Sequence, residues 1–519
     1  MKQAGEVANS GIAAPNRQTI WLLFAALFLV ALIPVLIVRV AALEDYPQHL
    51  ARIYILGSLE KSAFLQRYYL PNWGFQSNLA IETVLLPLTK VVSIDFAGKL
   101  FLAMLLLGLS SGTLALHRVI HGRWSLWPLL SFFFLYNRIF LGGIVNYLFT
   151  LGLALWAFAA WIYFRDRPFY VRAAISIPIA LILLLGHLVA FGVYGLAVAG
   201  FEISRQLQSA RKWYAVSPGD VFAAGIQFVV ALAILKVFSS TSGVIANYHY
   251  GFLQKFNAPL NLFYNYNLLF DATVFLAFVV LMVSGIWAGW ILVERRLVLS
   301  IVLIMLAFLA MPYEIAGSDG ADRRLTVAVA LLIVSATDWR PMMVRWKTGI
   351  LAALVCLFVV RMTIIASNWL ASDNIYRQYL AAFERLPRGA RMAVVIAHNS
   401  SQTITNPPIN GVPQYAIIER DAFVNTTFTV LGAQPLNFTP RYSALARQMP
   451  LSIYEQRDLA QLADPIRSAE INPFVCARLA GYDYILVAHE SDFPEKPPRW
   501  LAPVAVGTDF RLFKIQPCE

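Results

Sequence analysis

Residues Ile20 to Val38, IWLLFAALFLVALIPVLIV, contain no charged side chain and are long enough to cross a membrane as one helix. They follow a polar segment, residues 1–19, that carries Lys2 and Arg17, and no small-residue cleavage site comes directly after them. We therefore expect an uncleaved signal anchor. Because Lys and Arg collect on the cytoplasmic side, its N-terminus is expected there.

The rest of the chain has the composition of a membrane protein. Of 519 residues, 59% are hydrophobic and 13% are charged, which is too few charges to cover several globular domains. The mean hydropathy is +0.63. In a membrane protein the basic residues mark the cytoplasmic loops, so the net charge of +12 is not a sign of nucleic-acid binding, and nucleic acid is a disfavoured partner. Cys356, Cys476 and Cys518 are too widely spaced for a zinc site.

Clusters of Lys and Arg predict the topology. Between neighbouring clusters lie hydrophobic stretches of two helices' length, so that every cluster can face the cytoplasm. This pattern predicts an α-helical polytopic protein with eleven spans, the N-terminus inside and the C-terminus outside. The expected spans are residues 20–38, 96–116, 124–141, 145–164, 173–186, 188–204, 219–238, 271–293, 297–312, 325–339 and 349–367.

Two regions are expected outside the membrane. Residues 39–95 form a long first external loop, in which the short segment Asn78 to Val92 contains Glu82, Pro87 and Lys90 and is predicted to lie on the surface as an amphipathic element. The domain plan is a cytoplasmic tail (1–19), a transmembrane domain (20–367) and a soluble periplasmic domain (368–519). We expect a multi-pass protein of a bacterial inner membrane.

The soluble domain is predicted to be a small α/β or α+β fold. Its expected strands are residues 392–397, 414–418, 482–488 and 510–515. Cys476 and Cys518 both lie in this domain, where an oxidising periplasm permits a disulfide. The spacing of two cysteines in a domain of this size is equally compatible with unpaired thiols.

The predicted topology places many ionisable residues at one membrane depth, on the outer face. Such residues are expensive to keep near a bilayer and are often functional. The sequence from residue 44 to 52, EDYPQHLAR, holds the acidic pair Glu44 and Asp45 with His49 and Arg52. We assign Asp45 as a base for a hydroxyl acceptor, with Glu44 as its acidic partner. The alternative is that Asp45 caps the helix that starts near Pro47.

Basic residues on the same face suit a phosphate. Guanidinium groups match phosphate oxygens. The candidates for phosphate or substrate binding are His49, Arg52, Arg138, His187, His249, Lys255, Arg323 and Arg324, and their possible acidic partners are Glu314, Asp319 and Asp322. His187 has the alternative of a hydrogen bond to a backbone carbonyl, and Arg323 and Arg324 have that of anchoring at the interface next to a helix start.

The arrangement resembles the GT-C superfamily of integral-membrane glycosyltransferases, which take sugars from polyprenyl-phosphate carriers. The matching features are the Glu44-Asp45 pair early in a long external loop, the amphipathic segment Asn78 to Val92, and the soluble tail from Asn368. The resemblance implies a lipid-linked donor, a lipid, glycan or protein acceptor in the cell envelope, and a leaving phosphate neutralised by Arg or Lys or by Mg²⁺ or Mn²⁺. It also implies transfer in one inverting step with Asp45 as base.

Two other classes stay open from the sequence. A transporter or flippase for lipid-linked sugars would use the same outer-face charges for binding, together with ionisable residues at mid-depth for coupling. A non-catalytic subunit for envelope assembly would use the tail to bind a partner, with Glu44 and Asp45 only capping a helix.

Overall fold

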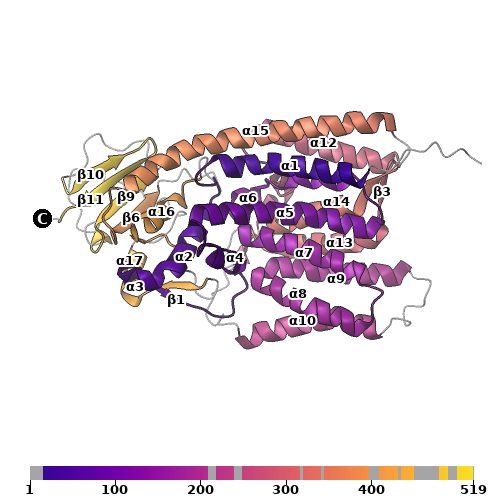
Figure 1. Cartoon of the computed structure of the whole chain (residues 1–519), viewed down its shortest axis with the longest axis horizontal. Coiled ribbons are helices and arrows are strands. Elements are labelled where there is room, and N and C mark those ends of the chain that lie inside the picture. The colour runs from indigo at the N-terminus through magenta and orange to yellow at the C-terminus, as the bar shows by residue number, and fades with distance from the viewer. Residues whose placement is uncertain are drawn as a thin grey trace, which may run out of the picture.

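The computed structural model describes residues 16–208, 218–238, 248–249, 251–315, 320–340, 344–396, 408–429, 434–448, 478–488 and 499–517. Within these residues, eight helices are long and apolar enough to cross a membrane. They are α1 (Arg17–Ile37), α5 (Ile94–His121), α7 (Val145–Tyr163), α8 (Phe169–Gly186), α9 (Leu188–Gln208), α10 (Pro218–Phe238), α12 (Leu268–Trp287) and α15 (Val344–Phe383). The chain is a multi-pass membrane protein, and these helices form a bundle (Figure 1).

Three of the eleven predicted spans are shorter elements. Residues 297–312 correspond to α13 (Arg295–Ala310) and residues 325–339 to α14 (Arg323–Ala336), which runs directly into strand β5 (Thr337–Trp339). Residues 124–141 are divided into a 3₁₀ helix, η2 (Trp127–Phe134), and the short helix α6 (Arg138–Leu141).

Asn137 causes the division between η2 and α6. Its Nδ2 donates to the carbonyl of Phe134, and its Oδ1 accepts from the N–H of Phe140 and caps α6. A continuous apolar run is therefore not one continuous helix, and the residues that the structure describes contain eight, not eleven, helices of membrane-spanning length.

Glycines allow a close contact between α5 and α7 in the bundle. A Cβ on Gly152 of α7 would lie 2.8 Å from the backbone carbon of Gly108 on α5, and one on Gly112 would lie 3.0 Å from the carbonyl oxygen of Gly152. Small residues four apart on one helix allow two backbones to approach in this way.

The C-terminal domain contains a five-stranded mixed sheet in the order β10-β11-β9-β6-β7. Strand β6 (Arg391–Ile396) pairs in parallel with β7 (Phe423–Val424) and β9 (Tyr484–Ala488), whereas β11 (Phe510–Ile515) pairs antiparallel with β9 and with β10 (Leu501–Val506). The strands expected at 392–397, 482–488 and 510–515 coincide with β6, β9 and β11.

The strand expected at residues 414–418 is wrong. This segment is the 3₁₀ turn η5 (Val412–Gln414) followed by α16 (Tyr415–Arg420). Pro413 lies in the first turn of η5, where its fixed φ favours a helical start, and this local preference outweighs the apolar run that suggested a strand.

Helix α15 connects the bundle to the sheet without interruption. It has 40 residues, which corresponds to a length of about 60 Å. The boundary expected at residue 368 therefore falls inside a helix. Figure 1 shows α15 running from the far end of the bundle to the C-terminal domain.

The first loop, residues 39–95, is structured and lies between the bundle and the sheet (Figure 1). It comprises α2 (Tyr46–Ser58), η1 (Leu59–Lys61), α3 (Ala63–Tyr68), β1 (Tyr69–Pro71) and α4 (Ala80–Leu88). The segment expected to be amphipathic contains α4. Strand β1 pairs antiparallel with β8 (Leu436–Phe438), so the loop and the domain share a sheet contact. The remaining described elements are β2 (Tyr248–His249), α11 (Phe252–Asn257), η4 (Leu260–Leu262), β3 (Ile291–Val293), β4 (Glu314–Ile315) and α17 (Pro440–Gln448).

Replacing Gly152 by Ala should destabilise the bundle by about 1–3 kcal/mol, because the added methyl group meets backbone atoms of α5 that have no rotamer to change. Thermal unfolding in detergent measures the effect. Gly192→Ala on α9 is the matched control: a Cβ there has open space, so removing a helical glycine should be neutral or stabilising. Equal behaviour of the two variants would contradict the close α5–α7 contact.

Candidate functional site

The turn at Glu44 and Asp45 is fixed by the backbone of the α6–α7 connection. The N–H of Glu44 donates to the carbonyl of Leu141 over 3.0 Å, and the N–H of Asp45 donates to that of Gly142 over 3.3 Å. The next residue, Gly143, has a φ of +76°, and a Cβ on it would lie 2.6 Å from the Asp45 nitrogen. Only glycine fits this conformation and this approach.

The other side of the turn contacts the C-terminal domain. A Cβ on Gly411 would lie 2.5 Å from the carbonyl oxygen of Glu44. The neighbouring Asn410 donates through Nδ2 to Oε1 of Glu44. The acidic pair is therefore enclosed between the helical bundle and the soluble domain.

Glu44 is buried, with 8% of its surface exposed, and its Oε2 has no hydrogen-bond partner among the described residues. Burial, and then the nearby charge of Asp45, raises the pKa of Glu44 to about 8, although Asn410 and Arg138 act in the opposite direction. Glu44 therefore holds a proton at neutral pH.

Asp45 differs from Glu44 in its surroundings. It is partly exposed and occupies the position before the first turn of α2, next to Tyr46 and Pro47. Its side chain makes no capping hydrogen bond to α2. The carboxylate is thus not committed to the helix start, as the capping alternative required.

His49 and Arg52 point into the protein, toward each other and toward α4. Arg52 is fully buried: its Nε donates to Oε1 of Glu82 over 2.6 Å, and one terminal nitrogen lies 2.9 Å from Nδ1 of His49. Burial, and then the charge of Arg52, lowers the pKa of His49 well below its usual value. These contacts fasten α2 to α4, a positioning role that differs from the phosphate contact expected from the sequence.

Arg138 is a cation close to Glu44, and Arg323 is a second cation close to Arg138. The guanidinium of Arg138 lies over the ring of Tyr264, 5.1 Å from its centre, and is within electrostatic range of both Glu44 and Arg323. Arg323 lies over the ring of Tyr313 at 4.9 Å, and its Nε is buried without a hydrogen-bond partner in the described structure. Among those residues neither forms an ion pair, so both suit an anionic ligand.

His187 and Arg324 form a second group. Nδ1 of His187 accepts from the N–H of Val189, and its ring packs edge-on against Tyr147, 5.4 Å between centres. The Tyr147 hydroxyl donates to the carbonyl of Arg324 over 2.6 Å. Arg324 is within electrostatic range of His187. The backbone partner of His187 is therefore an N–H group, whereas the alternative expected from the sequence was a carbonyl.

Lys255 is satisfied by protein acceptors. Its Nζ contacts the carbonyls of Phe308 and Met311 and Oδ2 of Asp322, each within 2.8 Å. Asp322 also accepts from the N–H of Arg323 at the start of α14. This set favours a structural role over phosphate binding.

Two of the remaining sequence candidates lie on short paired strands. His249 on β2 pairs in register with Glu314 on β4. Asp319, Cys476 and Cys518 are outside the described residues. Sequence reasoning missed Asn410 and Gly411, which lie more than 360 residues from their contacts, and it missed the role of Glu82, whose signal was a lone acid in an apolar segment.

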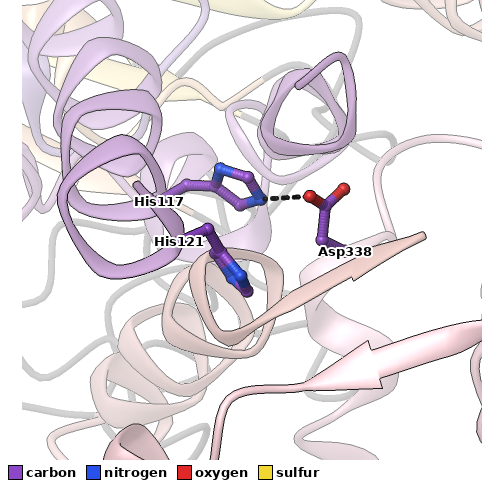
Figure 2. A group of neighbouring side chains, drawn as sticks. All are labelled: His117, His121 and Asp338. Atoms are coloured by element: carbon purple, nitrogen blue, oxygen red, sulfur yellow. Dashed lines mark ion pairs between the residues drawn. The ribbon is translucent and has the colours of Figure 1, made fainter. Parts of the chain in front are cut away.

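A group of possible metal ligands, His117, His121 and Asp338, is also present. It lies away from the acidic pair. Two of its members are in the last part of α5, and Asp338 is in β5, which pairs with β3 at the end of the bundle opposite the sheet (Figures 1 and 2).

Glu82→Gln should destabilise the protein by about 3–5 kcal/mol, because it leaves the buried charge of Arg52 without its counter-ion. The double variant Arg52→Met/Glu82→Leu should recover most of this loss. Thermal unfolding of both variants tests the expectation. A stable Glu82→Gln single variant would show that Arg52 does not depend on Glu82.

Glu44→Gln should change how stability depends on pH. The folded protein holds the Glu44 proton up to about pH 8, whereas the unfolded chain releases it near pH 4.5, so this group's contribution falls as pH rises between these values. From pH 6 to pH 8 the variant should gain on the order of 2–3 kcal/mol relative to the wild type. Unfolding curves at both pH values provide the measurement, with the exposed Glu60→Gln as a control that should follow the wild type.

Comparisons with known proteins rest on structure. No family model and no curated protein matches the sequence. The crystal structure of ArnT from Cupriavidus metallidurans in the apo state is similar, with a TM-score of 0.52 and 10% sequence identity over 96% of this chain and 98% of that chain. A second crystal structure, of ArnT from the same organism bound to undecaprenyl phosphate, has a TM-score of 0.49 with the same identity and coverage.

The match to apo ArnT extends over nearly the whole of both chains, so it includes the bundle, the first loop and the sheet domain. At this identity it establishes the architecture. The chain has the fold of ArnT, which agrees with the membrane-helical fold with a small C-terminal domain that was expected from the sequence.

Proposed function

We propose that this protein transfers a sugar from a polyprenyl-phosphate-linked donor to a cell-envelope acceptor, at the periplasmic face of a bacterial inner membrane. The observation that carries the proposal is the pair of unlike carboxyl groups at the junction of bundle and domain. Glu44 is buried and protonated near pH 7, and Asp45 is partly exposed with no bond to its helix start. Because the two environments differ, one carboxyl group can stay protonated while its neighbour is ionised and accepts a proton.

Asp45 is the base in this mechanism. It takes the proton of the acceptor hydroxyl, the oxygen attacks the anomeric carbon, and the bond to the lipid phosphate breaks in the same step with inversion. A single displacement requires one base and a stabilised leaving group. Glu44 stays neutral, bonded to Asn410, and supports the position of Asp45.

The leaving phosphate is neutralised by arginine in this proposal. Arg138 lies close to Glu44 and Arg323 lies close to Arg138, and each guanidinium packs over an aromatic ring. These two guanidinium groups supply positive charge for the phosphate in this proposal, the role that the resemblance assigns either to Arg or Lys or to Mg²⁺ or Mn²⁺.

Asp45→Asn should lower sugar transfer by about 100-fold or more, since the amide keeps the shape of the side chain but accepts no proton. The assay uses purified protein in lipid nanodiscs with radiolabelled sugars on undecaprenyl phosphate, the carrier bound to ArnT in one crystal structure. Thermal unfolding checks that the variant is folded.

The matched control is Asp95→Asn, another acid of residues 39–95, whose carboxylate accepts from Arg39 and Tyr415. It should keep transfer within a few-fold of the wild type. Undiminished transfer by a folded Asp45→Asn would refute the assignment of the base. Movement of intact lipid-linked sugar across liposomes without transfer would favour the flippase class, and neither activity with any donor would favour the assembly subunit.

A further inference from the structure

His117 and His121 lie four residues apart, on one face of α5, and share their side of the helix with Asp338 of β5. The two imidazole centres are 4.3 Å apart. One ligand atom from each of the three side chains lies within 4.8 Å of the others. Figure 2 shows the His117 ring directed at the Asp338 carboxylate, with His121 beside it.

His117 is the least satisfied polar side chain of the group. It is fully buried, and neither of its ring nitrogens makes a hydrogen bond of good geometry among the described residues, although the Thr337 backbone lies nearby. The separation of 3.7 Å between its Nε2 and Oδ2 of Asp338 is too long for a hydrogen bond. A buried imidazole without a partner is costly, so the geometry calls for a ligand at this nitrogen.

His121 and Asp338 have the additional hydrogen bonds that metal-binding side chains usually have. Nε2 of His121 lies 3.1 Å from the carbonyl of Ser335, an arrangement that leaves Nδ1 to bind. Oδ1 of Asp338 accepts from the Ser125 hydroxyl and from the N–H of Trp339. Histidines that bind metals usually donate their second nitrogen to a carbonyl or carboxylate, and ligating carboxylates are hydrogen-bonded in turn.

We propose that His117, His121 and Asp338 bind one divalent transition-metal ion of the zinc class. Two imidazole nitrogens and one carboxylate oxygen suit zinc or cobalt, whereas Mg²⁺ and Ca²⁺ prefer oxygen ligands. Three protein ligands leave a fourth position for water. The ion links the end of α5 to β5, the segment that follows α14.

This site is separate from the proposed transfer reaction. His117 lies 23 residues along α5 from Ile94, which corresponds to about 35 Å. The first loop, with the acidic pair, adjoins the opposite end of the bundle, next to the sheet (Figure 1). The ion therefore has a structural role in fastening the far end of the bundle, and the proposal does not depend on the sugar-transfer assignment.

Arg123 provides an internal test because it competes with the ion. Its terminal nitrogen lies 2.7 Å from Oδ2 of Asp338, the same oxygen that faces His117. A cation at this oxygen opposes a metal there. Arg123→Gln should therefore bind the metal more tightly than the wild type. If the cluster is only an ion-pair network, neither protein should bind the metal.

The experiment uses full-length protein in detergent, purified with an affinity tag that contains no histidine and stripped with a chelator. Titration with Co²⁺ should give the visible absorption bands of a tetrahedral site, saturate at one ion per chain, and be reversed by Zn²⁺. The ion should also raise the midpoint of thermal unfolding, since it binds the folded state.

His117→Gln and Asp338→Asn should abolish the absorption bands and the thermal shift. The matched control is Asp220→Asn, which removes another arginine-bound carboxylate, partner of Arg172 and Arg205, and should bind Co²⁺ as the wild type does. Absence of saturable Co²⁺ binding by both the wild type and Arg123→Gln would overturn the proposal. Binding that survives Asp338→Asn and His117→Gln with folded protein would overturn the ligand assignment.

Discussion

The site depends on two backbone hydrogen bonds, from Glu44 and Asp45 to the carbonyls of Leu141 and Gly142. These bonds join the segment after the first span to the α6–α7 connection, about a hundred residues later in the chain. Neither can be reached unless Gly143 adopts a positive φ and carries no side chain. The position of the acidic pair is thus determined by main-chain atoms, which are less mobile than side chains, and a carboxylate held in this way is suited to precise proton transfer.

Burial then gives the two neighbouring acids different chemistry. Glu44 faces Asn410 in the closed side of the turn, and its charge would be expensive there, so it remains protonated near neutral pH. Asp45 is one residue further along and is partly exposed. Arg52 and Glu82, in the same loop, show another way to bury ionisable groups. Their two opposite charges are buried together and hold α2 on α4.

Much of this architecture could be predicted because hydrophobicity acts locally. The long apolar helices, the element around residues 80–88 and three of the strands follow from runs of residues that sequence alone displays. The division of 124–141 could not be predicted, since it depends on one asparagine whose two bonds compete with a helix.

The site could be predicted only in part, for a related reason. Glu44, Asp45 and Arg138 are brought together as expected, because loops on one membrane face meet. His49, Arg52 and Lys255 instead find partners within the protein, and a side chain's partners are set by tertiary contacts that residue type does not reveal. Asn410 belongs to a domain whose position relative to the bundle is likewise a tertiary property.

The uninterrupted course of α15 has a mechanical consequence. Where domains are joined by a flexible linker, each reorients freely, and a ligand that bridges them must first restrict that motion. Here the connection is a rod: Arg361, on the bundle part of α15, is anchored to Asp271 and to the carbonyl of Tyr136, and Tyr376, further along the same helix, donates to the carbonyl of Pro408 in the domain. The sheet and the membrane helices therefore move together, and the orientation of the sheet follows that of the bundle.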